Sequence, residues 1–149
     1  MSLKIGTPAP AFSLPATTGK MIDLNELKGQ ACVLFFYPKA FTGTCTAEVC
    51  EFKNHFEDFK DLNITVLGIS KDTMPTLLKF KEQYKLPYEL LSDPTAYVCR
   101  LYDTIVPVIG LVNRVTYLLD KQHQIVATYA DMFDAKAHIR KMIDKIKQA

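Results

Sequence analysis

The sequence contains no apolar run long enough to cross a membrane or to form the hydrophobic segment of a signal peptide. It also lacks an excess of charge of one sign, because 18 basic residues and 16 acidic residues leave a formal charge of +2. The lysines do not gather into a stripe with aromatic residues between them, which is the pattern expected of a nucleic-acid surface. We therefore expect a cytoplasmic protein that binds neither a membrane nor nucleic acid.

Glycine is scarce, with six residues in a chain of 149, and no linker, low-complexity tract or internal repeat divides the sequence. Hydrophobic residues make up 48% of the chain and charged residues 23%, which is ordinary for a compact globular protein. The sequence therefore predicts a single domain over residues 1–149 with a sizeable buried core.

Cysteine is limited to four residues, and in a reducing cytosol these are better interpreted as reactive or buried thiols than as a disulfide framework. Cys32 lies in an apolar run typical of a central strand, where a free cysteine usually packs as a small hydrophobic residue. Cys99 falls in a short helical pattern and is expected to be buried or half-buried. Cys45 and Cys50 remain as the candidates for chemistry.

The residues around Cys45 are typical of the start of a helix. Pro38 and Gly43 precede it, and three threonines surround it. Exposed backbone N–H groups and the positive end of the helix dipole favour a thiolate over a thiol at such a position. Hydroxyl groups of Thr42 and Thr44 can hydrogen-bond to the sulfur or to a substrate oxygen, and Pro38 can shield the pocket from water.

Arg114 is the best candidate for a fixed positive charge beside this sulfur. It comes directly before a predicted strand at 115–119, so its side chain can reach across the end of the sheet toward the start of the helix. Of the other arginines, Arg100 sits in a predicted helix and Arg140 lies among lysines on a face that we expect to be solvated. The alternative for Arg114 is an ordinary surface charge at the end of a strand.

The five-residue spacing of Cys45 and Cys50 has a geometric consequence. In an intact helix it gives about 7.5 Å of rise and roughly 140° of rotation, which places the two Cα atoms about 8.6 Å apart. A disulfide needs a Cα separation below about 7 Å. The two sulfurs can therefore join only if the first turns of the helix unwind, which favours a transient catalytic disulfide over a structural one.

Apolar periodicity and turn signals predict an α/β fold with a thioredoxin-like mixed sheet and helices on both faces. The first expected elements are a hairpin formed by 12–14 and 21–23, a helical turn at 23–29, a strand at 31–37 and an amphipathic helix of about four turns running through residue 59. A strand at 64–70, a helix to about 84 capped by Asp72 or Thr73, an extended segment at 86–91 and a helix to about 102 follow. The last expected elements are a loop at 103–113, strands at 115–119 and 124–129, and a C-terminal helix.

The segment Pro38-Lys39-Ala40-Phe41-Thr42-Gly43-Thr44-Cys45 fits the Pro-x-x-x-Thr-x-x-Cys pattern of peroxiredoxins. With Cys50 five residues on, the chain resembles the bacterioferritin comigratory protein or peroxiredoxin Q subfamily. The resemblance implies a peroxiredoxin variant of the thioredoxin fold with an N-terminal hairpin, and reduction of hydrogen peroxide and organic hydroperoxides without a metal or organic cofactor.

The same resemblance implies roles for individual residues. Cys45 would be the peroxidatic cysteine and Cys50 the resolving one, as in an atypical two-cysteine enzyme, while Pro38, Thr42 and Arg114 would shape and polarise the pocket. Thioredoxin or a similar dithiol donor would reduce the intramolecular disulfide. We expect a monomer, since both cysteines lie in one chain segment, and Cys99 stays open as an alternative resolving residue.

Two other functions are compatible with parts of the sequence. A thioredoxin-type thiol–disulfide oxidoreductase could use the same fold, although that chemistry normally uses Cys-x-x-Cys at the helix start. A metal-binding or interaction module could use Cys45, Cys50 and His55 as ligands, but their regular spacing spirals around a helix instead of converging. His55, His123 and His138 are more simply surface or half-buried residues.

Overall fold

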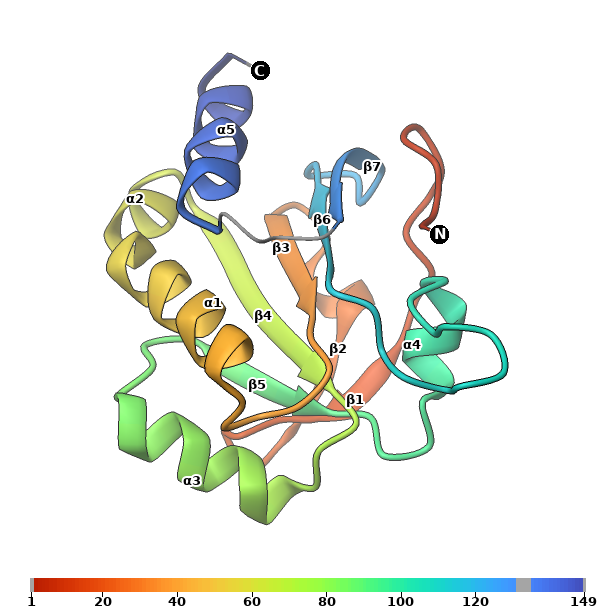
Figure 1. The fold of residues 1–149 in the computed structure, drawn as a ribbon. Coiled ribbons are helices and arrows are strands. Elements are labelled where there is room, and N and C mark those ends of the chain that lie inside the picture. Colours follow the sequence, from red (N-terminus) through yellow and green to blue (C-terminus); the bar gives the residue numbers. More distant parts are fainter. Residues whose placement is uncertain (1, 131–134, 149) are drawn as a thin grey trace.

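The computed structural model describes residues 2–130 and 135–148 as a five-stranded mixed sheet between two layers, with a separate two-stranded hairpin sheet (Figure 1). The elements are β1 (Ser13–Pro15), β2 (Met21–Asp23), the 3-10 helix η1 (Leu24–Leu27), β3 (Ala31–Phe36), α1 (Gly43–Asn54), α2 (Phe56–Asp61), β4 (Ile64–Ser70), α3 (Met74–Tyr84), β5 (Glu89–Ser92), α4 (Tyr97–Leu101), β6 (Val115–Leu119), β7 (Ile125–Ala130) and α5 (Ala135–Gln148).

The strand order of the large sheet is β5-β4-β3-β6-β7. Strands β3, β4 and β5 are parallel, whereas β6 pairs antiparallel with both β3 and β7. Because β6 runs opposite to β3, its first residue, Val115, pairs with the last residue of β3, Phe36. This register brings the segment before β6 and the segment after β3 to the same end of the sheet, where the candidate residues Arg114 and Cys45 lie.

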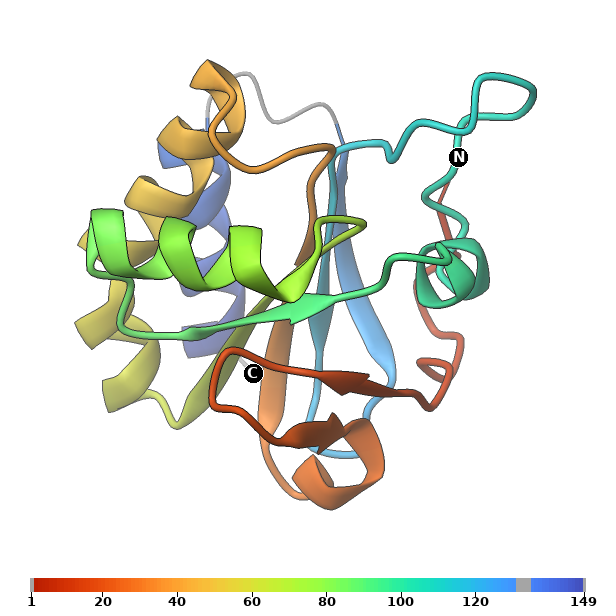
Figure 2. The ribbon, with the colours of Figure 1, turned by 90° about the horizontal axis from the view of Figure 1, so that it is seen from below.

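Two hydrophobic cores lie on opposite faces of the sheet. Helices α1, α2, α3 and α5 cover one face, and the N-terminal segment with α4 covers the other (Figures 1 and 2). Alternating side chains of β3 enter the two cores, so that Val33 and Phe35 belong to the first while Cys32, Leu34 and Phe36 belong to the second. This alternation is the two-residue period of a strand whose two faces are both covered.

The close packing of the first core requires a glycine in the middle of β4. A Cβ atom added at Gly68 would lie 2.6 Å from the Phe35 ring and 2.9 Å from a methyl group of Leu90. Phe35 itself stacks on Phe52 of α1, with ring centroids 4.4 Å apart. The missing side chain of Gly68 therefore makes room for the ring that joins the sheet to α1.

The predicted elements are present, with two differences in extent. The helix expected to run through residue 59 is broken at His55, whose φ of −105° and ψ of 11° end α1 and start α2. The helix expected to reach about residue 102 is confined to Tyr97–Leu101. Phe52 and Phe59, on either side of His55, both enter the first core, so the apolar periodicity continues across the break. Periodicity therefore could not reveal the break.

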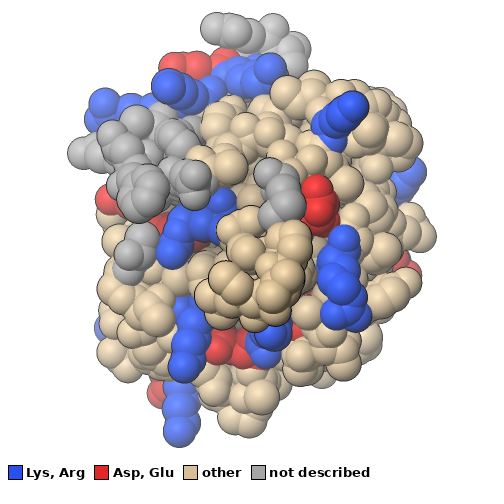
Figure 3. Space-filling model, turned by 45° about the vertical axis from the view of Figure 1, so that its right-hand side comes forward, with Lys and Arg blue, Asp and Glu red and all other residues tan. Residues whose placement is uncertain are grey.

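The surface shows charges in separate groups. On the face seen in Figure 3, lysine and arginine side chains are interrupted by acidic residues and by uncharged surface. Within the described ranges, none of the helices combines the length and the apolar character that a membrane span requires.

Candidate active site

Cys45 lies in the first turn of α1. Thr42 is the N-cap residue with extended backbone angles, φ −82° and ψ 150°, and Cys45 is the third residue of the helix. Its backbone N–H is therefore among the first four of the helix, which have no intrahelical acceptor. The predicted position of Cys45 at a helix N-terminus is confirmed. Its side chain is fully buried in the first core.

Arg114 reaches the sulfur from the opposite segment. Its Nη1 donates a hydrogen bond to Cys45 Sγ over 3.4 Å, and its side chain is only 16% exposed. The antiparallel register of β3 and β6 explains the contact, since Arg114 directly precedes the residue paired with Phe36. The interpretation of Arg114 as an ordinary surface charge is wrong. The guanidinium supplies fixed positive charge where a thiolate needs it.

Glu48 shares the same guanidinium. Its Oε1 lies 3.5 Å from Arg114 Nη1, and the residue is 1% exposed, one turn of α1 after Cys45. Burial raises the pKa of this carboxyl group from 4.5 to about 7, although the Arg114 charge and hydrogen bond act to lower it. The second oxygen, Oε2, has no hydrogen-bond partner within residues 2–130 and 135–148. The raised pKa favours the protonated form of Glu48 below about pH 7, and in that form it leaves the positive charge of Arg114 available to the sulfur.

Tyr37 is a second buried polar group near this sulfur. Burial raises the pKa of its phenol far above the usual range, and the negative charges of Cys45 and Glu48 act in the same direction. The phenol therefore stays neutral and keeps its O–H as a donor. Its Oη is buried and makes no hydrogen bond of ordinary geometry among the described residues, although the Ser70 hydroxyl lies close enough to act on its pKa in the lowering direction. Such a group can orient a polar ligand, because an unpaired buried hydroxyl gains from any acceptor brought within reach.

The other predicted pocket residues occupy the loop between β3 and α1. Pro38 is half-buried and Thr42 is exposed. The Thr42 hydroxyl donates over 2.8 Å to the Lys39 carbonyl, which closes the loop on itself. The structure thus places Pro38 and Thr42 in the segment that delivers Cys45. The bond from Thr42 to Lys39 leaves the oxygen of the hydroxyl able to accept a hydrogen bond. The side chain of Thr44 lies outside the described ones.

Cys50 lies in the same helix as Cys45 and is partly buried against the first core. All four cysteines are free thiols, and α1 is continuous across both Cys45 and Cys50. An ideal helix keeps their Cα atoms about 8.6 Å apart, beyond the reach of a disulfide. Joining the two sulfurs therefore requires the start of α1 to open.

Cys99 and Cys32 lie across the sheet from the pair in α1. Both are fully buried members of the second core. Burial raises the pKa of the Cys32 thiol to about 12 and that of Cys99 still further. Neither thiol is available as a thiolate at neutral pH, and the whole sheet separates Cys99 from Cys45.

The metal-site alternative receives no support from the geometry of His55. Its Nδ1 lies 3.3 Å from Asp58 Oδ2, and its Nε2 lies 3.9 Å from Glu51 Oε2. Across the described residues, histidine, cysteine, aspartate and glutamate side chains form no group of three or more that could hold a metal ion.

The expectation of a surface or half-buried position is wrong for His123, which is 2% exposed. Its Nε2 lies 3.1 Å from the Leu27 carbonyl, and its φ of 61° lies in the left-handed region of the β6–β7 turn. The side chain of His138 lies outside the described ones.

Glu48 and Tyr37 were missed by the reasoning from sequence. Glu48 counted only as one of the residues between Cys45 and Cys50 in the peroxiredoxin-like segment, and Tyr37 only as the last residue of the predicted strand at 31–37. A signal for Glu48 was present, since it is three residues after Cys45 and so shares a helix face with it. Its partner, Arg114, is 66 residues away in the sequence, so the residues around Glu48 do not reveal the pair.

Comparisons with known proteins agree on one family. A family model described as AhpC/TSA family matches residues 5–128. The chain is 34% identical to the peroxiredoxin bcp of Coxiella burnetii, covering 98% of this chain and 100% of that protein. It is 37% identical to the chloroplastic peroxiredoxin Q of Suaeda salsa, covering 90% of this chain but 63% of that protein. Among solved structures, the peroxidoxin BcpB from Mycobacterium tuberculosis matches with a TM-score of 0.90 and 31% identity, covering 98% of this chain and 97% of that one.

Proposed function

The chain belongs to the AhpC/TSA family as a peroxiredoxin, and we propose that it reduces hydroperoxides with Cys45 as the peroxidatic residue and Cys50 as the resolving one. The observation that carries the proposal is the 3.4 Å contact from Arg114 Nη1 to Cys45 Sγ at the N-terminus of α1. Two sources of positive potential, the guanidinium and the helix end, meet at one sulfur.

In the first step, the Cys45 thiolate attacks the nearer peroxide oxygen. The S–O bond forms as the O–O bond breaks, the other oxygen leaves as an alcohol or water after taking a proton, and Cys45 becomes a sulfenic acid. Arg114 stabilises the negative charge that passes from sulfur to the leaving oxygen. The buried Tyr37 O–H can donate a hydrogen bond to a peroxide oxygen, and the Thr42 hydroxyl oxygen can accept a hydrogen bond from the peroxide O–H.

In the second step, the Cys50 thiol attacks the sulfenic sulfur of Cys45, a disulfide forms and water leaves. The position of Cys50 in the same helix makes a second chain unnecessary, which supports a monomer. Cys99 is disfavoured as the resolving residue, because it is buried on the other face of the sheet. An external dithiol such as thioredoxin would return the disulfide to two thiols by exchange, in the cytoplasm.

The test is peroxide consumption coupled to thioredoxin and its reductase, with the parent compared with Cys45→Ser, Cys50→Ser and Cys99→Ser. We expect no turnover with Cys45→Ser. Cys50→Ser should still form the sulfenic acid but should not be recycled, and Cys99→Ser should behave as the parent.

Three results would contradict parts of this proposal. Turnover by Cys45→Ser would refute the peroxidatic role of Cys45. Full turnover by Cys50→Ser together with loss in Cys99→Ser would transfer the resolving role to Cys99. Peroxide consumption that continues with a small dithiol but not with thioredoxin would show that thioredoxin is not the reductant.

A further inference from the structure

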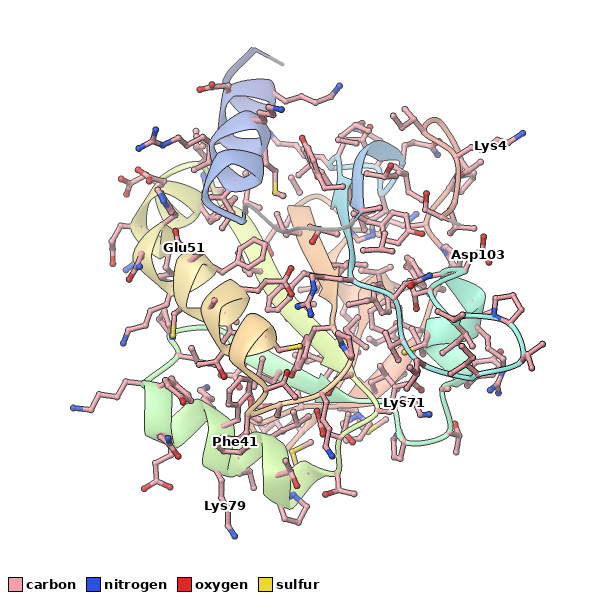
Figure 4. The ribbon with its side chains drawn as sticks, in the orientation of Figure 1. Lys4, Phe41, Glu51, Lys71, Lys79 and Asp103 are labelled. Atoms are coloured by element: carbon pink, nitrogen blue, oxygen red, sulfur yellow. The ribbon has the colours of Figure 1, made fainter. Side chains whose placement is uncertain are left out.

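Phe41 is the last residue before the N-cap of α1, and its ring lies on α3. The centroid of the Phe41 ring is 4.9 Å from that of Phe80 and 6.4 Å from that of Tyr84. Figure 4 shows Phe41 between the start of α1 and α3. Phe80 is fully buried, whereas Phe41 is 43% exposed. The ring is therefore held by a rigid platform on one side only.

The backbone of Phe41 is unfavourable for a residue of its type. Its φ of 65° lies in the left-handed region, which residues with a Cβ atom rarely occupy. The ring contacts of Phe41 are with Phe80 and Tyr84 of α3. A residue with a strained backbone whose side chain rests on two rings is a natural point of release.

The chain immediately before Phe41 is fixed. The Ala40 N–H donates over 2.8 Å to Asp72 Oδ2, and the Ser70 hydroxyl donates to the same carboxylate oxygen over 2.8 Å. Ser92 Oγ in turn donates over 2.6 Å to the Asp72 carbonyl. Ala40 is consequently tied to the ends of β4 and β5. Any opening that starts from the helix must stop at this point, which makes Phe41 the first residue free to move.

The ring has space to move into. A shallow depression open to solvent is lined by Phe41 together with Lys79, Glu82 and Gln83 of α3. These side chains are exposed, and Lys79 points into solvent in Figure 4. The Phe41 ring can therefore leave Phe80 and Tyr84 without displacing buried side chains.

We propose that the stacking of Phe41 on Phe80 and Tyr84 is a latch that decides whether Cys45 stays beneath Arg114 or is released toward Cys50. Phe41 is thus a positioning residue for the proposed function, on which this inference rests. With the ring seated, the start of α1 is folded and Cys45 contacts Arg114. With the ring released, the turn opens and the sulfur of Cys45 can reach Cys50.

The latch controls the fate of the sulfenic acid. In the released state, the Cys50 thiol attacks Cys45, the S–S bond forms and water leaves. In the seated state, a second hydroperoxide can oxidise the Cys45 sulfenate instead, transferring one oxygen to sulfur to give a sulfinate while the peroxide becomes an alcohol or water. The ratio of disulfide to sulfinate therefore reports the position of the latch.

The experiment mixes reduced protein with excess hydrogen peroxide, quenches with an alkylating agent and measures disulfide and Cys45 sulfinate by mass spectrometry. We expect Phe41→Ala to raise the disulfide-to-sulfinate ratio by about two- to tenfold, as the loss of an aromatic pair implies. Tyr84→Ala, which removes a ring from the other side of the contact, should raise it in the same direction. Phe41→Tyr keeps the ring and should therefore keep the parent ratio. Leu78→Ala, at an exposed apolar residue of α3 outside the stack, should also leave the ratio unchanged.

This ratio separates the latch from simple destabilisation, because both products form only in molecules whose Cys45 has already reacted. A parent-like ratio in both Phe41→Ala and Tyr84→Ala would overturn the latch and leave the proposed function intact. A parent that consumes peroxide without forming the Cys45–Cys50 disulfide would overturn the resolving role of Cys50, and the latch with it.

Discussion

The protein should lose stability as the pH rises from acid to alkaline. Replacing Glu48 with glutamine should make this loss much smaller. The carboxyl group is 1% exposed, and burial is the largest cause that raises its pKa from 4.5 to about 7. Since the folded pKa lies above the unfolded one, the unfolded chain releases this proton more readily. The contribution of protonated Glu48 to stability is therefore fully present below pH 4.5 and is lost as the pH rises through about 7.

The size of the effect follows from the two pKa values. The interval from 4.5 to about 7, at about 1.4 kcal/mol for each pKa unit, corresponds to about 3 kcal/mol in the free energy of unfolding. Arg114 and Tyr37, which surround Glu48, are present in both proteins, so their contributions largely cancel in the comparison. The amide of glutamine has nearly the same shape as the carboxyl group and does not titrate.

The assay is urea unfolding of the reduced proteins, followed by circular dichroism near pH 5 and near pH 8. The parent should lose about 2 to 3 kcal/mol more than Glu48→Gln between these conditions. The matched control is Glu51→Gln, the same substitution at a partly exposed residue of α1, which should lose as much stability as the parent. Equal losses in the parent and in Glu48→Gln would refute the reasoning, because they would show that Glu48 titrates in the folded protein as it does in the unfolded chain.

Three further predictions concern other residues. Arg114→Gln should slow the peroxide step about 10- to 100-fold in stopped-flow measurements, as expected for a lost hydrogen bond to a charged group. Arg100→Gln, at an arginine that bonds the Thr95 carbonyl, is its control, and equal rates in the two variants would remove Arg114 from the mechanism. Gly68→Ala should lower the free energy of unfolding by about 1 to 3 kcal/mol in urea through overpacking, unless the neighbouring ring and methyl group can move aside. Cys99→Ala should leave the turnover number in the coupled assay unchanged. A loss of thioredoxin-dependent turnover in this variant would instead indicate that Cys99 is a resolving residue.

Much of the fold was predictable because the signals are local. Apolar runs at residues 31–37 and 64–70 predicted buried strands, and Pro75 with Thr73 before it predicted the start of α3. The match to the Mycobacterium tuberculosis structure confirms the thioredoxin-like fold of the peroxiredoxin type that these patterns and the Cys45 motif indicated. The break at His55 was missed, because it depends on backbone angles that leave the periodicity of apolar residues intact.

Local sequence was enough to single out Cys45 as the candidate nucleophile and to place it at the start of a helix. Proline, glycine and threonine before Cys45 are local determinants of a helix start, and the five-residue interval to Cys50 fixes a distance that no intact helix can bridge. Both inferences hold because they depend on one short segment, whose conformation is largely set by neighbouring residues.

Which distant groups meet this segment depends on how the whole chain packs. The pairing of Phe36 with Val115 places Arg114 on the Cys45 sulfur, and burial under the folded chain raises the pKa of Glu48. The stacking of Phe41 on α3 likewise joins residues about 40 positions apart. Such contacts depend on strand register and on the layering of helices over the sheet, which follow from the packing of the whole chain and not from the spacing of residues in any one part of it.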